Sequence, residues 1–533
     1  SKACRFLGQR PKPSSAEDGI PNTKRFFAGV WDAFFKKKSA PQVKNFLNII
    51  LEKGAGGTFF DKLDNSLSPR FSELFYAALN IILYGGLYRR MDFIKWLNEN
   101  IIWGAPMIFL MLGTGIFFTI KLRFFQFRHL GKIMGETLFS KRKSTDSEAL
   151  SPFQTLTASL ATTLGTGNIV AIGSAIVIGG AGAVFWMWVS AFLGMATSYA
   201  ENFLGMRYRR KNPDGTYTGG AFYYIRDGIN SKALAAVFAA FCILASVGMG
   251  NMAQMNAMSF SLRYSFGCPE IISGIIAAIC VCGMICGGLK RLGKITEKLI
   301  PAISAVYILG CLWVIAANLS QIPDMFVRIF GQAFDFRAVG GGFFGSAMVK
   351  SMGWGFRRGI FSNEAGLGSS VMLHSASSET NPQKQSLWAT MQVFIDTIVM
   401  CSLTAFAVIL TGADKNGSDG MRTAVVAFES AFGDFAGAFV SICIFVFAVT
   451  TAAGWSTYGA ACVEYLFGRG GKKLYAVIFV LLTAAGAVAE IDIVWQLADL
   501  FNGLMAIPNI WALLNLHDEV NIMFKKVEHE RNS

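Results

Sequence analysis

The stretch from Ser151 to Ile178, SPFQTLTASLATTLGTGNIVAIGSAIVI, decides how this chain folds. It is long and apolar enough to cross a bilayer, because a transmembrane helix needs about 20 such residues. Its centre is poor helix, since Gly165 and Gly167 each destabilise a helix interior by about 1 kcal/mol relative to alanine. A break at this depth is tolerated only where it lines a cavity or packs against protein, because lipid cannot hydrogen-bond the backbone. The alternative is that the two glycines only let neighbouring helices approach closely.

The composition is typical of a helical membrane protein with many spans. Of the 533 residues, 53% are hydrophobic and only 15% are charged, whereas about a quarter of the residues in a soluble domain are charged. The net charge of +14 does not require a nucleic-acid partner, and we expect none, because the basic residues lie mainly in short loops and in the first ninety residues. The ten cysteines have no zinc-binding spacing, so we expect most of them to be small packing residues.

About eleven apolar segments are predicted to cross the membrane, and the charges between them predict their direction. Basic residues gather in alternate loops, as at 207–211 and 290–298, whereas the intervening loops are uncharged, acidic or mixed. By the positive-inside rule, the basic loops and the C-terminus are cytoplasmic. The first segment then runs inward, and the second, with its glycine break, begins in the cytoplasm. The segments are 100–120, 152–178, 183–206, 232–262, 270–288, 299–317, 341–373, 387–411, 436–460, 474–489 and 493–515.

Residues 1–90 differ in kind from the rest and form an N-terminal extension. They carry basic clusters, and their one apolar run, 74–88, is short for a span. If the first predicted segment begins outside, these basic residues are exported, which conflicts with the positive-inside rule. Two interpretations stay open: either 74–88 crosses the membrane as an extra apolar helix, or residues 1–90 are not part of the native protein and Met91 is its natural start.

A second interrupted segment lies at 341–373, GGFFGSAMVKSMGWGFRRGIFSNEAGLGSSVML. Its apolar pattern stops at 362–368, where a carboxylate, an amide and two glycines are unfavourable at membrane depth unless they face a polar cavity. The alternative is an extracellular loop followed by a short span. If 152–178 is the first helix of a core, then 341–373 is the sixth, and five helices begin at each on opposite sides of the membrane. That arrangement is typical of an inverted repeat whose broken helices meet at the bilayer midplane.

Paired breaks of this kind suit a small amino acid and a cation. Half-helix N-termini present free N–H groups and a positive dipole end to a substrate carboxylate. Unwound carbonyls and side-chain oxygens suit a hard cation such as sodium. Both breaks supply such oxygens, from Thr166, Asn168, Ser362 and Asn363.

At these residues the sequence resembles the alanine or glycine:cation symporter family, the sodium:alanine symporters, within the amino acid–polyamine–cation superfamily fold. The resemblance covers about residues 91–520 and implies an all-α polytopic membrane protein with five-plus-five inverted repeats and one additional N-terminal helix. It also implies a sodium-coupled symporter that imports alanine and glycine by alternating access, and not an enzyme. The matching stretches are SPFQTLTASLATTLGTGNIVAIGSAI, GAVFWMWVSAFLGMATSYAEN, DGTYTGGAFYYI, GNMAQMNAM, RRGIFSNEAGLGSS, VFIDTIVMCSLTA and GWSTYGAACVEYLFG.

The predicted division of the chain follows from the span count and the two breaks. The N-terminal extension, 1–90, precedes an extra helix and cytoplasmic loop at 91–151. The two inverted repeats occupy 152–317 and 341–516, and 517–533 is a cytoplasmic tail.

The resemblance implies a substrate site built from both breaks and two further helices. Its residues are Gly165, Thr166, Gly167, Asn168, Gln254, Ser362, Asn363 and Trp455. The residues of the first break would hold the backbone groups of the substrate, and Trp455 would wall a small side-chain pocket. The residues alone leave alternatives open, because Gln254 equally suits a hydrogen bond to another helix and Trp455 equally suits packing.

The resemblance also implies two sodium sites. Asn168 would bind one sodium beside the substrate, and Thr450 and Thr451 are candidate ligands for a second sodium between core helices 1 and 8. Threonine hydroxyls also hydrogen-bond the backbone of their own helix, so this alternative stays open for each threonine.

Acidic residues inside spans are candidates for coupling, because a buried carboxylate in a membrane is unfavourable unless it has a function or a partner. Glu364 and Asp396 are such residues. Asp396 equally suits the neutralisation of Arg357 or Arg358. Glu201 lies near the cytoplasmic end of its span, where we expect an interface residue.

A proton-coupled amino acid transporter of the same fold is the alternative function. It needs a titratable residue at the cation site, and only Glu364 and Asp396 qualify, because none of His129, His374, His517 and His529 is predicted to lie deep in a span. A membrane enzyme is disfavoured, since the chain has no HExxH, GxSxG or GxxxxGK[ST] motif. We expect a multi-pass protein of the cell membrane, in bacteria the inner membrane, whose partners are a small neutral amino acid, sodium and lipid.

Overall fold

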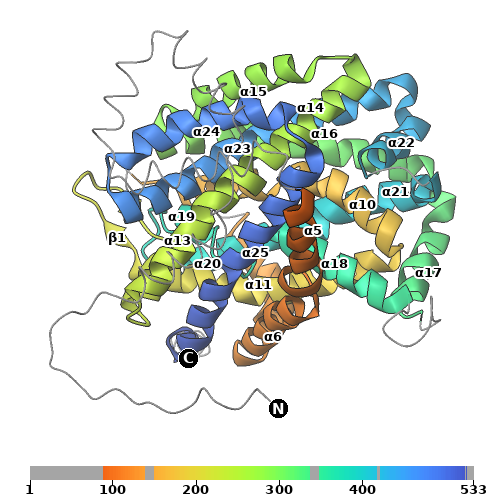
Figure 1. Cartoon of the computed structure of the whole chain (residues 1–533). Coiled ribbons are helices and arrows are strands. Elements are labelled where there is room, and N and C mark those ends of the chain that lie inside the picture. Colours follow the sequence, from red (N-terminus) through yellow and green to blue (C-terminus); the bar gives the residue numbers. More distant parts are fainter. Residues whose placement is uncertain (1–87, 139–148, 336–346, 417–419, 523, 525–533) are drawn as a thin grey trace, which may run out of the picture. The chain divides into compact units, whose positions relative to one another are not determined.

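The computed structural model describes residues 88–138, 149–335, 347–416, 420–522 and 524 of the chain. All of them belong to the compact unit Gly86–Ser533, so the predictions for the extension before residue 88 lie outside the described residues. Nearly all of the described chain is helical, in agreement with the predicted all-α class (Figure 1). Two short strands, β1 (Arg210–Lys211) and β2 (Tyr217–Thr218), pair antiparallel.

The helices fall into two groups, one before and one after the gap at 336–346. The first group is α5 (Tyr88–Leu97), η2 (Asn98–Ile102), α6 (Ala105–Lys121), α7 (Phe125–Arg128), α8 (Leu130–Glu136), α9 (Pro152–Thr163), η3 (Thr166–Asn168), α10 (Val170–Gly179), α11 (Gly182–Tyr208), α12 (Ala221–Asp227), α13 (Lys232–Val247), η4 (Gly248–Met252), α14 (Ala253–Phe266), α15 (Glu270–Ile285), α16 (Gly288–Ala317), η5 (Leu319–Gln321) and α17 (Ile322–Ala333). The second group is α18 (Ala347–Asn363), α19 (Val371–His374), α20 (Pro382–Val393), η7 (Phe394–Cys401), α21 (Ser402–Leu410), η8 (Ala413–Asn416), α22 (Gly420–Phe432), η9 (Gly433–Phe435), α23 (Ala436–Phe467), α24 (Gly471–Val488) and α25 (Ile491–Asn515).

Eight helices of the described chain are long and apolar enough to cross a membrane, and the pair Pro152–Thr163 and Thr166–Gly179, bent by 62°, adds a ninth span if it is counted as one. The predicted segment 270–288 contains α15, which has 16 residues and is shorter than a usual span. The predicted segment 341–373 begins outside the described residues and continues as α18 and α19. The number eleven therefore stays a prediction, whereas the polytopic helical fold is confirmed.

Helices that occupy corresponding positions in the two halves of the chain pack against each other. The helix after the first broken span, α11, contacts α20, which follows the second broken span. The third helices pair in the same way, since α13 and α14 both contact α23, and the fourth helices, α15 and α24, also pair. Packing between corresponding helices of the two halves is the arrangement that an inverted repeat produces. The predicted inverted repeat is therefore confirmed.

The predicted extra N-terminal helix is the span α5–η2–α6, which lies beside α25 (Figure 1). Asn98 donates from Nδ2 to the backbone oxygen and to Oε1 of Gln496, both at 2.8 Å. Trp103 donates from Nε1 to the carbonyl of Asp499 at 2.9 Å. Because both partners lie on α25, this span is fixed to the last helix of the second repeat.

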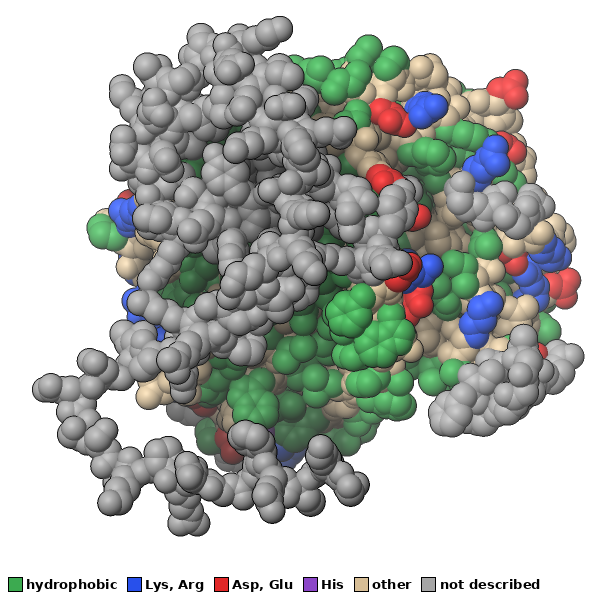
Figure 2. Space-filling model, in the orientation of Figure 1, with side chains coloured by type: hydrophobic (Ala, Val, Ile, Leu, Met, Phe, Trp, Pro, Cys, Tyr) green, Lys and Arg blue, Asp and Glu red, His purple; other side chains and the backbone are tan. Residues whose placement is uncertain are grey.

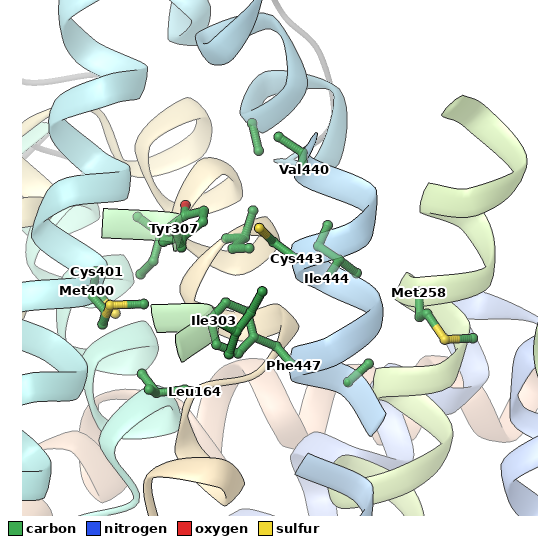
Figure 3. Packing of buried hydrophobic residues seen from close by; sticks show 14 of the residues in the cluster. Leu164, Met258, Ile303, Tyr307, Met400, Cys401, Val440, Cys443, Ile444 and Phe447 are labelled. Carbon is green, nitrogen blue, oxygen red and sulfur yellow. The ribbon is translucent and has the colours of Figure 1, made fainter. Parts of the chain in front are cut away.

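A continuous hydrophobic core holds the first broken span against helices of both halves. Figure 3 shows buried side chains of this core from the first break, α16 and α23, among them Leu164, Ile303 and Phe447. On the outside, Phe109 and Leu309 are 68% and 65% exposed. Hydrophobic side chains also cover much of the described surface in Figure 2, as expected for helices that contact lipid.

Candidate functional site

The first break lies between α9 and α10. The helix α9 begins at a capping box, in which Ser151 Oγ accepts from the Gln154 N–H at 3.1 Å and Gln154 Oε1 accepts from the Ser151 N–H at 3.0 Å. The helix ends at Thr163, and Gly165 is extended, with φ −119° and ψ −161°. Asn168 Oδ1 then accepts the Gly165 N–H at 3.0 Å, and the Thr163 carbonyl accepts the same N–H at 2.9 Å. The predicted break is confirmed, and the Asn168 amide holds its shape.

The second break separates α18 from α19. After Asn363 come three residues with left-handed backbone, Glu364, Gly366 and Gly368, with φ of 59°, 91° and 75°. Such a φ is uncommon for a residue with a Cβ such as Glu364. Ser369 Oγ donates to Glu364 Oε2 at 2.6 Å. Because Glu364 is 0% and Asn363 is 2% exposed, the segment is an interrupted span and not an exposed loop.

The two breaks meet at the carboxylate of Asp396 in η7. Asn168 Nδ2 donates to Asp396 Oδ1 at 2.7 Å and to Ser362 Oγ at 3.1 Å. Ser362 Oγ donates to Asp396 Oδ2 at 2.8 Å, and Thr397 Oγ1 donates to the same oxygen at 2.9 Å. Asn363 Nδ2 donates to Thr397 Oγ1 at 3.2 Å. One side chain from each broken helix thus contacts a single buried carboxylate.

The π-helical geometry of η7 adds two residues that sequence reasoning missed, Thr397 and Cys401. Residues five apart share a face of a π-helix, whereas an α-helix turns them apart. Cys401 follows Asp396 by five, and its Sγ lies 3.3 Å from both Asn168 Nδ2 and Ser362 Oγ. The only signal in the sequence was their closeness to an intramembrane acid.

Arg357 forms an ion pair with Asp499 of α25 and not with Asp396. Arg358 lies over the ring of Trp354, with 5.3 Å between the guanidinium carbon and the ring centre. The interpretation that Asp396 neutralises one of these arginines is therefore wrong. The hydrogen-bond partners of the Asp396 carboxylate in the described structure are uncharged.

Gln254 of α14 binds the first break directly. Its Oε1 accepts from Thr166 N–H at 3.0 Å and from Thr166 Oγ1 at 2.9 Å, and its Nε2 donates to the Met249 carbonyl at 3.2 Å. A Cβ at Gly165 would lie 2.8 Å from Gln254 Oε1 and 3.0 Å from Thr451 Oγ1. Glycine is therefore needed where α14 and α23 both approach the break.

The two neighbouring threonines of α23 point in different directions. Thr451 Oγ1 donates to the carbonyl of Ala161 at 2.9 Å and lies 3.4 Å from that of Leu164, both at the end of α9. Thr450 Oγ1 donates to two carbonyls of its own helix, at 2.9 and 3.0 Å. Successive residues of an α-helix differ by about 100° around its axis. The structure thus brings Thr451 to the first break and turns Thr450 away.

Trp455 is buried on α23, four residues after Thr451. A Cβ at Gly250 would lie 2.3 Å from Trp455 Cγ, so η4 packs tightly on the indole. Tyr458 meets this ring edge-on, with 5.1 Å between centres, and its hydroxyl lies 3.0 Å from Thr162 Oγ1. The indole N–H of Trp455 and the carboxylate of Glu364 are both buried and interact with each other, so α23 contacts the second break as well as the first.

Backbone pairing ties the start of the first broken span to the segment after the second. The Leu150 N–H donates to the Ala376 carbonyl at 3.3 Å, and the Ser378 N–H donates to the Leu150 carbonyl at 2.7 Å. Arg209, which follows α11, donates to three carbonyls of the segment 375–379, at 2.6 to 3.1 Å. These contacts hold the ends of the two spans together on this side of the breaks.

Two residues near the ends of predicted spans are buried in the protein. His374 ends α19 and is 0% exposed, with Nε2 3.0 Å from Gln392 Oε1 and Nδ1 2.9 Å from Gln385 Nε2. The short helix α19 packs against α9 and α20, and that no histidine lies deep in a span stays a prediction. Glu201 is also 0% exposed and accepts the Gly368 N–H at 3.2 Å, so it is not an interface residue.

Comparisons with known proteins identify a family and several relatives of this chain. The sequence profile described as the sodium:alanine symporter family matches residues 89–533. The chain is 40% identical over 437 residues to the sodium/alanine symporter AgcS of Methanococcus maripaludis, which covers 80% of this chain and 95% of AgcS. It is 34% identical to the probable sodium/glutamine symporter GlnT of Bacillus subtilis, over 83% of this chain and 92% of GlnT. Among solved structures, a substrate-bound, outward-open sodium-coupled sialic acid symporter aligns with a TM-score of 0.49 and 11% identity, over 71% of this chain and 82% of that chain.

The match to the family profile extends over most of the chain, and AgcS is covered over nearly its whole length. The described structure adds a polytopic helical fold with two broken spans. The chain therefore belongs to the sodium:alanine symporter family and is a multi-pass membrane protein for cation-coupled amino acid transport.

Proposed function

We propose that this protein is a sodium-coupled symporter that imports small neutral amino acids, alanine and glycine, by alternating access. The observation that carries the proposal is the contact of both helix breaks with one buried carboxylate, through Asn168 and Ser362 on Asp396. A ligand that moves either break changes this shared centre, so the binding of amino acid and cation is linked there. The 40% identity to AgcS, a sodium/alanine symporter, supports this choice of substrate and ion.

In this proposal the substrate backbone binds at the first break, from Gly165 to Asn168. The N-terminus of α10 begins just after this break, and its positive dipole end favours a carboxylate. Gln254 fixes the Thr166 N–H and hydroxyl, while Ser362 and Asn363 close the site from the second break. Trp455 limits the space for the substrate side chain, which supports a small amino acid.

The first proposed sodium site lies at the oxygens of Ser362 and Asp396, and Asn168 adds its amide oxygen there only when the amide turns over, because Nδ2 faces the carboxylate. A buried cation requires a compensating charge, and the Asp396 carboxylate supplies one. Hydroxyl, amide and carboxylate oxygens are ligands that suit a hard cation. The buried carboxylate of Glu364 lies in the second break, beside this site in sequence, and stays a candidate for coupling.

The second proposed sodium site lies between α9 and α23. The carbonyl oxygens of Ala161 and Leu164 lie 2.9 and 3.4 Å from Thr451 Oγ1 there. Thr450 is not included, because its hydroxyl is bonded to its own helix. Each sodium that enters adds about 2.3 kcal/mol of driving force per 100 mV of membrane potential. One or two ions are thus sufficient for strong accumulation.

The proposed orientation has a cytoplasmic C-terminus and tail at 517–533 in a cell membrane, in bacteria the inner membrane. The basic loops at 207–211 and 290–298 support it through the positive-inside rule. The extra span and its cytoplasmic loop occupy 91–151, and the two repeats occupy 152–317 and 341–516. Each broken span opens one repeat.

Uptake of labelled alanine into proteoliposomes tests the proposed function. An imposed sodium gradient is expected to drive alanine accumulation, and unlabelled glycine is expected to inhibit it. A lithium gradient or a pH gradient alone is not expected to drive accumulation. Accumulation driven by a pH gradient without sodium would instead favour proton coupling, with Glu364 and Asp396 as the titratable groups. Alanine and glycine uptake that is unchanged by sodium contradicts the proposal.

The substitution Thr451→Val is expected to raise the sodium concentration for half-maximal uptake about tenfold or more, because a hydroxyl ligand is lost without a change in shape. The measurement is initial alanine uptake as a function of sodium. Thr450→Val is the matched control on the next residue and is expected to stay within about twofold of wild type. Equal effects of both substitutions, or the opposite order, contradict the assignment of Thr451.

The substitution Trp455→Phe is expected to let larger neutral amino acids compete with alanine. The loss of the second ring makes room for about one or two methylene groups, and each changes discrimination by roughly tenfold. Valine should therefore inhibit alanine uptake about tenfold better than it does in wild type. The control is Trp388→Phe in α20, and an unchanged order of competitors in Trp455→Phe removes Trp455 from the pocket wall.

A further inference from the structure

One face of α11 lies along the second break. A Cβ at Gly194 or at Gly205 would lie 3.0 or 2.1 Å from side chains of the segment 365–371. Between these two close approaches, Glu201 Oε1 accepts the Gly368 N–H at 3.2 Å. The three positions of α11 share a helix face, because they are separated by seven and four residues. The helix therefore contacts the break along its length, and Glu201 supplies a polar contact in the middle.

Asn509 of α25 links Glu201 to the same break. Its Nδ2 donates to Glu201 Oε1 at 2.5 Å and to the Gly366 carbonyl at 3.0 Å. The hydroxyl of Tyr224 in α12 donates to Asn509 Oδ1. All three side chains are 2% exposed or less. We call Glu201, Asn509 and Tyr224 the Glu201 brace.

The second break needs support from outside its own backbone. Its residues are not helical, and buried backbone N–H and C=O groups require partners. The Glu201 brace provides partners for the Gly368 N–H and the Gly366 carbonyl. A Cβ at Gly368 would lie 2.9 Å from Asn509, which shows how closely the brace approaches. The break therefore takes its shape from α11 and α25 as well as from its glycines.

We propose that Glu201 is a positioning residue for the transport site. Through Gly368 and Asn509 it fixes the second break, and thereby places Ser362 and Asn363 at the end of α18. The inference rests on the proposed function, because its effect is expected on amino acid and sodium binding. In this proposal Glu201 acts through its acceptor oxygen and not through its charge, and Oε1 accepts from both the Gly368 N–H and Asn509 Nδ2.

Two substitutions separate an acceptor from a charge. Glu201→Gln keeps an acceptor oxygen and removes the carboxylate, so the alanine KM and the sodium dependence should stay within about twofold of wild type. Glu201→Ala removes the acceptor and is expected to raise the alanine KM about tenfold or more, with a smaller change in the maximal rate. The control is Ser190→Ala on α11, because Ser190 is buried but bonds its own helix at Met187.

A rescue experiment tests the pairing of Glu201 with Asn509. Asn509→Asp places a second carboxylate where an amide donates to Glu201, and it is expected to weaken alanine uptake about tenfold or more. The addition of Glu201→Gln removes one of the two carboxylates and so relieves their repulsion at this contact. The double variant should therefore regain most of the uptake that Asn509→Asp loses.

The variants are compared in sodium-loaded proteoliposomes and, as purified proteins without substrate, by their melting temperatures. If Glu201→Gln is as damaging as Glu201→Ala, if Glu201→Ala behaves like wild type, or if Glu201→Gln does not rescue Asn509→Asp, the brace is rejected. If alanine uptake by the wild-type protein does not depend on sodium, the proposed function is rejected instead. In that case the melting temperatures still decide, because the brace predicts a low value for Asn509→Asp and its recovery in the double variant.

Discussion

Replacement of Asn168 by alanine is expected to reduce sodium-driven alanine uptake about 100-fold or more while the protein stays folded in the membrane. The Asn168 amide accepts the Gly165 N–H at 3.0 Å and donates to Asp396 and Ser362 at 2.7 and 3.1 Å. A hydrogen bond to a charged group contributes about 1.5–3 kcal/mol, so the loss of these contacts accounts for the expected effect. The measurement is initial uptake in proteoliposomes, normalised to the amount of inserted protein.

The control for Asn168→Ala lies on α10, the second half of the same broken span. Ser174 of α10 donates only to the carbonyl of Val170 in its own helix, at 3.1 Å, among the contacts of the described chain. Ser174→Ala is expected to transport alanine like wild type. Wild-type transport by Asn168→Ala would remove Asn168 from the site, and a lost melting transition would show a folding defect instead.

Replacement of Asp396 by asparagine is expected to raise the sodium concentration for half-maximal uptake about 100-fold or more. The change keeps the shape of the side chain but removes the charge that both breaks contact. When one partner of a buried charge pair is removed, the loss is about 3–5 kcal/mol. For sodium at the Asp396 carboxylate, this corresponds to a sodium affinity that is lower by a factor of about 100 or more. Sodium titrations of alanine uptake, with wild type and Asp396→Asn at equal protein amounts, measure the shift.

The control for Asp396→Asn is Asp434→Asn in η9, where the carboxylate is exposed. Its sodium dependence should not change. A sodium response of Asp396→Asn like that of wild type would show that the carboxylate does not bind the cation. A response to a pH gradient that disappears in Asp396→Asn, without any sodium response in wild type, would favour the proton-coupled alternative.

The two breaks were predictable from the sequence, because their signals are local. Glycines in apolar segments, with polar oxygens around them, are unfavourable in lipid unless the helix is interrupted there. Alternating basic loops then predicted the inverted order of the repeats. Hydropathy alone does not decide the number of spans. The helix α15 has only 16 residues, and the predicted segment 341–373 begins outside the described residues.

The side-chain partners within the site were not predictable, because they depend on helix rotation and helix type. Thr450 and Thr451 are adjacent in the sequence, and only their angle around α23 decides which one faces Ala161. Cys401 reaches Asn168 because η7 is a π-helix, which no composition signal indicated.

Long-range contacts explain the remaining differences. Arg357 stands near the second break in the sequence, yet its partner Asp499 comes from the last helix. Glu201 and His374 lie near the ends of their predicted spans, where exposed positions are common. Both are buried because segments far apart in the chain, α25 for Glu201 and α9 for His374, pack against them.

The most direct test of the account is alanine binding to the purified protein at different sodium concentrations, without any gradient. If one centre joins both breaks to the cation, sodium and alanine must strengthen each other's binding by the same factor. The account predicts that the alanine Kd falls about tenfold or more as sodium is raised to saturation, and that Asp396→Asn removes this dependence. An alanine Kd that is the same with and without sodium would contradict it.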